Sequence, residues 1–411
     1  MSETAPAVEN LTLGLEDPVA SPDVAETANW AAVASLSLGV FGLVTAEFLP
    51  TSLLTRMASD LDISVGVAGQ TVTATAVVGG IAGVATAMVT RGIDRRLVLW
   101  SLTLLLLVSN VLSAVASSLT TLLVARVLLG IALGGFWSMA GALALRLVPP
   151  DKVARAMSIV FTGVSLATVC AAPVGAYVGD LWGWRAAFVL AGVVGAVALV
   201  VQLATMPKLP AVGAPGFATL LELLGGPGLR TTLIALVLVI SGHFAGFTYV
   251  RPFLEQVPGF GIEAISLILL AFGIGGFLGN LAAAPVIERS IKASVLLGAL
   301  AIALIALILV AFGSSVTLSA GGIALWGFFF GFLPVSFQTW AVRMASDQAE
   351  TAGGLLVAAF QIAITSGAVF GGLLIDGLGP LGVMAYAATG TVAGAVVVLA
   401  FAKGPAARGA A

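Results

Sequence analysis

The sequence predicts an all-α membrane protein in which twelve transmembrane helices form two pseudo-symmetric six-helix bundles. Three observations predict this fold: an apolar composition, a series of twelve apolar runs, and an internal repeat at a fixed offset. Of the 411 residues, 60% are hydrophobic and only 9% are charged. A soluble domain carries roughly one quarter charged residues. Because so little polar surface cannot cover a body in water, lipid is the predicted solvent for most of the chain.

The twelve apolar runs are separated by charges and turn residues, and each is long enough to cross a bilayer, which takes about 20 residues. They fall at 31–54, 66–89, 97–117, 120–146, 153–178, 184–206, 230–251, 262–287, 293–313, 316–342, 352–375 and 381–402.

Composition divides the chain into five segments. Residues 1–29 carry six acidic residues and no Lys or Arg, which predicts a disordered acidic tail. The predicted bundles cover 30–206 and 229–402, joined by a linker at 207–228 that is rich in Pro and Gly. Residues 403–411 form a second tail.

The distribution of basic residues predicts the orientation in the membrane. With a cytoplasmic N-terminus, thirteen Lys and Arg fall on the inner side and three on the outer side, and Arg126 lies within a span. Short loops rich in Lys and Arg stay in the cytoplasm. Both termini, both tails and the linker are therefore predicted to be cytoplasmic.

An internal repeat relates the two predicted bundles. The stretch from Asp151 to Asp180 matches the stretch from Asp347 to Asp376 at an offset of 196 residues. The same offset carries Glu47 onto His243. A parallel repeat of six helices is typical of transporters whose halves enclose a substrate site near the middle of the membrane.

Three ionisable side chains lie inside the predicted spans: Glu47, Arg126 and His243. A charge at the bilayer centre costs roughly 2.5–3.5 kcal/mol on insertion scales, so such groups usually face a cavity or each other. Glu47 is predicted to bind and release a proton, with locking of helices by hydrogen bonds as the alternative. Arg126 either tunes that acid or holds carbonyl groups near the outer end of its span. His243, the one histidine, either exchanges protons or packs against apolar neighbours.

Uncharged polar and aromatic side chains in the spans are the candidates for substrate binding. Amides can read the donors and acceptors of a substrate, and aromatic faces can stack on a flat ring. For each aromatic residue, contact with lipid or packing is the alternative. The candidates are Asn280, Gln338, Gln361, Trp137, Phe136, Trp340 and Tyr249.

Several classes of protein lack support in the sequence. There is no GxxxxGK[ST] loop, which argues against a nucleotide-driven pump. One Cys and one His cannot supply a metal cluster, so no metal or cofactor is predicted. Basic residues are scattered rather than clustered, so nucleic-acid binding is not expected. Three embedded ionisable groups are few for a membrane enzyme, and a monomeric transporter of small molecules is the favoured class over an enzyme or a scaffold.

Three short stretches resemble motifs of the major facilitator superfamily. "ARVLLGIALGG" at 125–135 resembles the R-x-x-x-G motif of the fourth helix, through Arg126 and Gly130. "AAPVGAYVGD" at 171–180 resembles the fifth-helix motif of the antiporter branch, through Pro173 and Gly175. Ala172 and Ala176 depart from that motif, because they stand where it prefers Gly.

"TRGIDRR" at 90–96 resembles the gating loop between the second and third helices of the same family. The basic positions are Arg91, Arg95 and Arg96, with Asp94 between them. Thr90 stands where the family has Asp, which puts the usual charge pairing at the inner gate in doubt.

The resemblance extends over nearly the whole chain after residue 30 and is strongest to the drug:proton antiporter branch. It implies export of purine ribonucleosides of the inosine or guanosine type across the bacterial inner membrane, in exchange for entering protons. It also implies that Glu47 carries the proton. Export of sugars or chloramphenicol-type drugs by the same mechanism remains an alternative, as does a facilitator that moves no protons.

Overall fold

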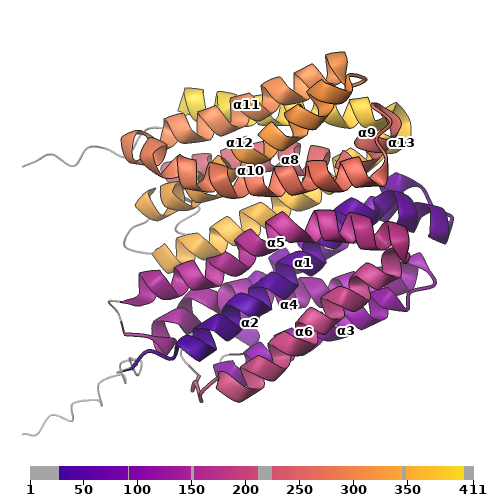
Figure 1. Cartoon of the computed structure of the whole chain (residues 1–411). Helices are drawn as coiled ribbons and strands as arrows, with labels where there is room; N and C mark the ends of the chain where they lie inside the picture. The colour runs from indigo at the N-terminus through magenta and orange to yellow at the C-terminus, as the bar shows by residue number, and fades with distance from the viewer. Residues whose placement is uncertain (1–26, 91, 150–151, 212–224, 345–348, 402–411) are drawn as a thin grey trace, which may run out of the picture.

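A computed structural model describes residues 27–90, 92–149, 152–211, 225–344 and 349–401. Every regular element in these ranges is a helix, and eleven helices are long and apolar enough to cross a membrane. The helices are α1 Trp30–Leu61, α2 Val65–Val89, α3 Arg95–Ala114, α4 Leu119–Leu147, α5 Val153–Leu181, α6 Trp184–Thr205, α8 Pro227–Thr248, α9 Val250–Gln256, α10 Ile262–Arg289, α11 Ile291–Phe312, α12 Val316–Met344 and α13 Ala349–Phe401 (Figure 1).

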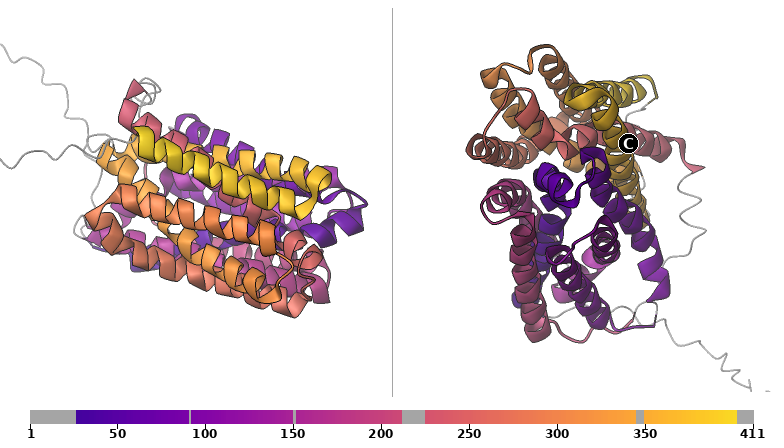
Figure 2. Two further views of the ribbon diagram at one scale, coloured as in Figure 1. Left: turned by 90° about the horizontal axis from the view of Figure 1, so that it is seen from above. Right: turned by 90° about the vertical axis from the view of Figure 1, so that its right-hand side faces the viewer.

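The helices pack in two groups that follow the order of the chain. In the first group α1 packs against α5 and α6, α2 against α4, and α3 against α4 and α6. In the second group α8 packs against α13, α10 against α12, and α11 against α12 and α13. We call α1–α6 the N-terminal half and α8–α13 the C-terminal half. Figure 2 shows them side by side in the end-on view, and α2 against α13 and α5 against α10 are the main contacts between them.

The predicted spans correspond to helices, but α1 extends further than its apolar run. The run ends at residue 54, whereas the helix continues to Leu61 and ends at Asp62 in the left-handed conformation (φ 55°, ψ 48°). Its last two turns carry Arg56 and Asp60, which form ion pairs with other helices. Loss of hydropathy therefore marks the edge of the hydrocarbon region here, and the helix continues beyond it.

The chain bends at two places, so some of the predicted spans do not correspond to single straight helices. The seventh predicted span is divided at Tyr249, where α8 ends and the short α9 begins. The last two predicted spans form one element, α13, which contains Gly379 at φ 70° followed by Pro380. A straight helix of the 53 residues of α13 would be about 80 Å long, more than twice the roughly 30 Å of a hydrocarbon core. The turn at Gly379 thus lets this element cross the membrane twice.

The ends of the molecule are distinguished by what they carry. We call the end where α1 begins and α13 finishes the terminal end, and the end that carries α9 the opposite end (Figure 1). At the terminal end Asn29 caps α1 by accepting from the Ala32 amide at 3.0 Å, and its own amide donates to the Thr205 carbonyl.

Close approach of helices in the N-terminal half depends on glycine. A side chain at Gly134 of α4 would overlap the backbone of α2 at Gly79 and Gly83. Gly130, one turn earlier, is in the same position against Thr75 and Val78. The R-x-x-x-G motif therefore seats α4 directly on α2.

Candidate functional site

A cavity of about 410 Å³ lies between the two halves. Helices α1 and α5 line it from the N-terminal half, and α8, α10 and α12 line it from the C-terminal half. Met157 near the start of α5 and Gln338 near the finish of α12 belong to its wall, so it extends from the middle of the protein toward the terminal end. This position suits a substrate site shared by both halves.

Nearly parallel aromatic rings form one wall of the cavity. The His243 imidazole stacks on Phe330 with centroids 3.6 Å apart and planes 4° apart. Phe247 and Phe272 lie 12° and 18° from the imidazole plane, at 5.7 and 6.3 Å. Because α8, α10 and α12 each contribute a ring, this wall belongs to the C-terminal half alone, and it matches the face of a flat ligand.

His243 is buried, with 1% of its surface exposed, and one of its nitrogens has a partner. The indole Nε1 of Trp326 donates a hydrogen bond to His243 Nδ1 at 2.9 Å. Trp326 is 2% exposed and lies behind the ring wall on α12. The repeat offset identified His243 as the equivalent of Glu47, but no feature of the sequence pointed to Trp326 or Phe330.

Two of the three candidate amides line the cavity. Asn280 of α10 and Gln338 of α12 are both exposed side chains within its wall. The third, Gln361 of α13, is 6% exposed and packs against Gly79 and Gly80 of α2, so it lies at the interface between the halves. The cavity thus pairs a flat aromatic wall with two amides that can donate and accept.

The four candidate aromatics lie outside the cavity wall. Trp137 packs against the cavity residue Phe161, with ring centroids 5.8 Å apart and planes tilted by 31°, and so supports the wall from behind. Phe136 is 1% exposed in the core of the N-terminal half, and Trp340 is 1% exposed in the core of the C-terminal half. Tyr249 is fully buried and donates to the Ala368 carbonyl at 3.0 Å.

Glu47 lies on α1, next to the point where the two halves meet at mid-depth. The carboxylate is half-buried, and within the described part of the chain it makes no hydrogen bond or ion pair. Glu47 is absent from the cavity wall, whereas the next residue, Phe48, lines the cavity. The Phe48 ring packs against the rings of Phe244 and Phe247 on α8, with centroid distances of 6.4 and 5.8 Å. A half-buried acid without a partner in a spanning helix has the character expected of a group that gains and loses a proton.

Arg126 is fully buried and holds α1 and α3 together. Its Nη1 donates to the Ala46 carbonyl at 2.9 Å, its Nη2 donates to the Ser113 hydroxyl at 2.8 Å, and its guanidinium lies 4.7 Å from the Phe188 ring centroid. The Ala46 carbonyl would normally accept from the amide of residue 50, but residue 50 is proline and has no N–H. Arg126 therefore satisfies a carbonyl that Pro50 leaves free, one residue before Glu47.

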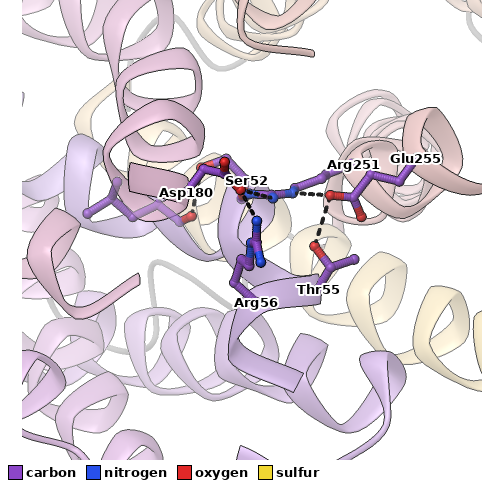
Figure 3. Close-up of polar contacts among 7 residues, drawn as sticks. Ser52, Thr55, Arg56, Asp180, Arg251 and Glu255 are labelled. Atoms are coloured by element: carbon purple, nitrogen blue, oxygen red, sulfur yellow. Dashed lines mark hydrogen bonds and ion pairs between the residues drawn. The ribbon is translucent and has the colours of Figure 1, made fainter. Parts of the chain in front are cut away.

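A network of charges joins the halves at the opposite end (Figure 3). Arg251 of α9 is 1% exposed; it donates to Glu255 at 2.7 Å and to the Ser52 carbonyl of α1, and lies 3.9 Å from Asp180 of α5. Arg56 of α1 pairs with Asp180. This network ties α1 and α5 to α9 at the opposite end. The sequence predicted Arg251 to be a cation in an outer loop, because the seventh apolar run ends at residue 251.

A second contact between the halves lies at the same end. Asp376 of α13 accepts from the Ser64 hydroxyl at 2.6 Å and from the Gly66 amide at 3.0 Å, at the N-terminus of α2. Asp376 and Asp180 are related by the repeat offset of 196 residues. Each repeat thus supplies one carboxylate that reaches the other half.

The loop at 90–96, which resembles the family's gating loop, is held by local hydrogen bonds. Arg95 donates to the Thr90 hydroxyl at 2.6 Å, in the place where the family pattern has a carboxylate. Asp94 caps α3 through the Arg96 amide and also accepts from the Leu209 amide.

The remaining residues predicted to take part in gating make separate local contacts. Arg96 lies 4.8 Å from the Trp100 ring centroid. Gly175 of α5 sits against Leu49 and Ser52 of α1, two residues after the helix-internal Pro173. Arg91 is outside the described residues.

The described residues contain no group of three or more His, Cys, Asp or Glu that could hold a metal ion. Aromatic rings, small side chains and the two amides form the cavity wall, and Glu47 lies outside it on α1.

A cavity between two groups of helices that are long and apolar enough to cross a membrane is typical of membrane transporters. Residues 36–355 match the Major Facilitator Superfamily, and the chain belongs to that family. The protein is thus a multi-pass membrane transporter of small molecules rather than an enzyme.

Relatives agree with this assignment, and solved structures share the fold. The purine ribonucleoside efflux pumps NepI of Escherichia coli (strain K12) and of Shigella dysenteriae are each 41% identical over 351 residues, which cover 85% of this chain and 89% of the relative. Among solved structures, a D-xylose-proton symporter aligns with a TM-score of 0.73 at 17% identity, covering 92% of this chain and 98% of the other. An inward-facing bacterial homologue of the lysosomal transporter Spinster aligns with a TM-score of 0.69 at 18% identity, covering 91% and 95%.

Proposed function

We propose that this transporter exports purine ribonucleosides of the inosine or guanosine type across the bacterial inner membrane in exchange for protons. The observation that carries the proposal is the cavity between the halves, with its parallel ring wall and the amides of Asn280 and Gln338. Such a site suits a flat base that bears hydrogen-bonding groups. The 41% identity to purine ribonucleoside efflux pumps over 85% of the chain supports the same substrate class.

The two halves act as pseudo-symmetric six-helix bundles in this proposal, with domains at 30–206 and 229–402 and the linker at 207–228. The repeat offset carries Phe48 onto Phe244, and these two rings contact each other between the halves at 6.4 Å. A contact between equivalent residues is expected on the axis that relates two repeats. The bias of basic residues supports cytoplasmic termini, so the terminal end faces the cytoplasm.

The structure then corresponds to an inward-facing state in an alternating-access cycle. The cavity extends toward the terminal end, and the Arg251 network closes the opposite end. To release substrate outside, the halves must rock apart at that network and close at the gating loop that holds Asp94 and Arg95.

Glu47 is the proposed proton carrier. Protonation of Glu47 from the outside helps to expel the substrate, and the return of the empty transporter carries the proton inward. By linkage, the proton and the substrate weaken each other's binding by the same factor. Arg126 supports this role from the carbonyl of Ala46, where it fixes the backbone beside the acid.

An uptake panel in inverted membrane vesicles tests the proposed function. Radiolabelled inosine and guanosine, together with a sugar and chloramphenicol, are offered under an imposed proton gradient. Uptake of the nucleosides that collapses when the gradient is dissipated is the expected result. Uptake of sugar or chloramphenicol in their place would identify the alternative substrates, and nucleoside uptake without any proton movement would identify a facilitator.

A further inference from the structure

His243 can meet a ligand through only one of its two ring nitrogens. Trp326 donates to Nδ1 at 2.9 Å, and an indole N–H is a donor that cannot accept. Nδ1 must therefore present a lone pair, and the single proton of the neutral imidazole resides on Nε2. The Trp326 contact selects the tautomer in which Nε2 is a hydrogen-bond donor.

Aromatic neighbours pack nearly parallel to the His243 ring, so a ligand can approach the Nε2–H donor only along the ring plane. Phe330 covers a face of the ring at 3.6 Å with planes 4° apart. Phe247 and Phe272 lie within 18° of the same plane. With a face stacked and the Nδ1 edge taken by Trp326, the Nε2 edge is the polar part of His243 that remains for a molecule in the cavity it lines.

We propose that His243 is a specificity-determining donor that reads a hydrogen-bond acceptor on the edge of the transported base, and that Trp326 is its positioning residue. This inference rests on the proposed function. The ligand is an uncharged, flat nitrogen heterocycle that lies parallel to the ring wall and turns an unprotonated ring nitrogen or a carbonyl oxygen toward Nε2. Purines with an oxo group carry two such acceptors, N7 and O6, on one edge.

The same geometry separates base recognition from proton coupling. An imidazolium carries protons on both nitrogens, and a proton on Nδ1 would face the indole N–H of Trp326. His243 therefore serves as a fixed donor through the cycle, and the proton is left to Glu47. The two residues that the repeat relates have taken different tasks.

The tautomer can be observed directly, because His243 is the chain's one histidine. Protein labelled with ¹⁵N-histidine gives imidazole signals from this residue alone. We expect the Nε2–H tautomer in the purified parent at neutral pH, and a mixture of tautomers in Trp326→Phe, which keeps the ring and loses the donor. The Nδ1–H tautomer or an imidazolium in the parent would overturn the proposal.

A matched control removes an indole N–H that has no partner. Trp100 of α3 is remote from the cavity wall, and its Nε1 is buried without a hydrogen-bond partner among the described residues. Trp100→Phe should leave the His243 signals unchanged. A tautomer change as large as that of Trp326→Phe would assign the effect to general loosening of the protein and overturn the role of Trp326.

Binding to the purified full-length protein tests the role of the donor. His243→Phe alone leaves the Trp326 N–H without an acceptor, so the double variant His243→Phe, Trp326→Phe is measured beside it. Loss of one neutral hydrogen bond should weaken inosine binding about three- to tenfold in both variants. Unchanged affinity in the folded double variant would overturn the role of His243. A parent that binds neither inosine nor guanosine would instead overturn the proposed substrate class.

Discussion

The contact between Arg126 and Ala46 predicts a specific rescue. Arg126→Met keeps a long apolar side chain but leaves the fully buried Ala46 carbonyl without a donor, because Pro50 has no N–H to offer. A buried acceptor without a partner costs about 1–3 kcal/mol. Pro50→Ala supplies the missing N–H within the helix, so the same Arg126→Met change should be less harmful in that background by about that amount.

Four proteins measure this coupling: the parent, the two single variants and the double variant. Their free energies of unfolding are obtained by equilibrium unfolding in mixed micelles. The cycle cancels the cost of burying the guanidinium and the loss of the Ser113 bond, because both are present in each background. Pro173→Ala is the matched control, since it restores an N–H to α5 rather than to α1, and it should add to Arg126→Met within about 0.5 kcal/mol. A coupling between positions 50 and 126 that is equally small would refute the reasoning.

Three further predictions concern transport, gating and packing. Glu47→Gln should abolish gradient-driven nucleoside uptake while retaining exchange of labelled for unlabelled nucleoside, and full gradient-driven uptake would remove Glu47 from coupling. Arg251→Gln should open the end that the proposal places outside. The assay uses a Cys170→Ser, Ser165→Cys protein, in which the cavity carries the single cysteine, and an impermeant maleimide is added outside. Labelling should be faster with Arg251→Gln than with Arg251, and an equal rate would contradict a gating role. Gly134→Leu should lower the free energy of unfolding by about 1–3 kcal/mol through overlap with α2, whereas Gly321→Leu, where a side chain meets open space, should change it little.

The positions of the long apolar helices along the chain were predictable, because hydropathy depends on composition over about 20 residues. The twelve predicted runs correspond to the helices, including the two that α13 joins through Gly379 and Pro380. The exact ends were less predictable, since α1 continues past its apolar run into a charged segment that pairs with other helices.

The cavity was predictable only in part. Residue type and span placement pointed to Asn280, Gln338 and His243, all of which line it. Tyr249 and Trp340 have the same composition-level features, yet Trp340 packs in the core of the C-terminal half and Tyr249 is buried where α2 meets α8 and α13. Which face of a helix turns toward the cavity depends on rotation and on kinks such as the one at Tyr249, and a nearly uniform apolar run carries little information about either.

The network of Arg251 was missed for a related reason. An arginine at the edge of a hydropathy run has the same pattern whether it faces water or is buried against carboxylates. The repeat held a usable signal, because it marked Asp180 and Asp376 as equivalent, and both reach across to the other half. Neither their partners nor their depth could be read from one sequence.

The two halves meet through ring contacts at mid-depth and through hydrogen bonds at the opposite end. At mid-depth Phe48 touches Phe244 and Phe247 through ring contacts, which change gradually as the rings slide. At the opposite end the halves are joined by directional hydrogen bonds to charged side chains, from Arg251 to the Ser52 carbonyl and from Thr55 to Glu255, and such bonds weaken steeply with misalignment. In the proposed rocking cycle, the energy needed to separate the halves would therefore come mainly from the hydrogen bonds at the opposite end, while the ring contacts at mid-depth would permit a gradual change of angle.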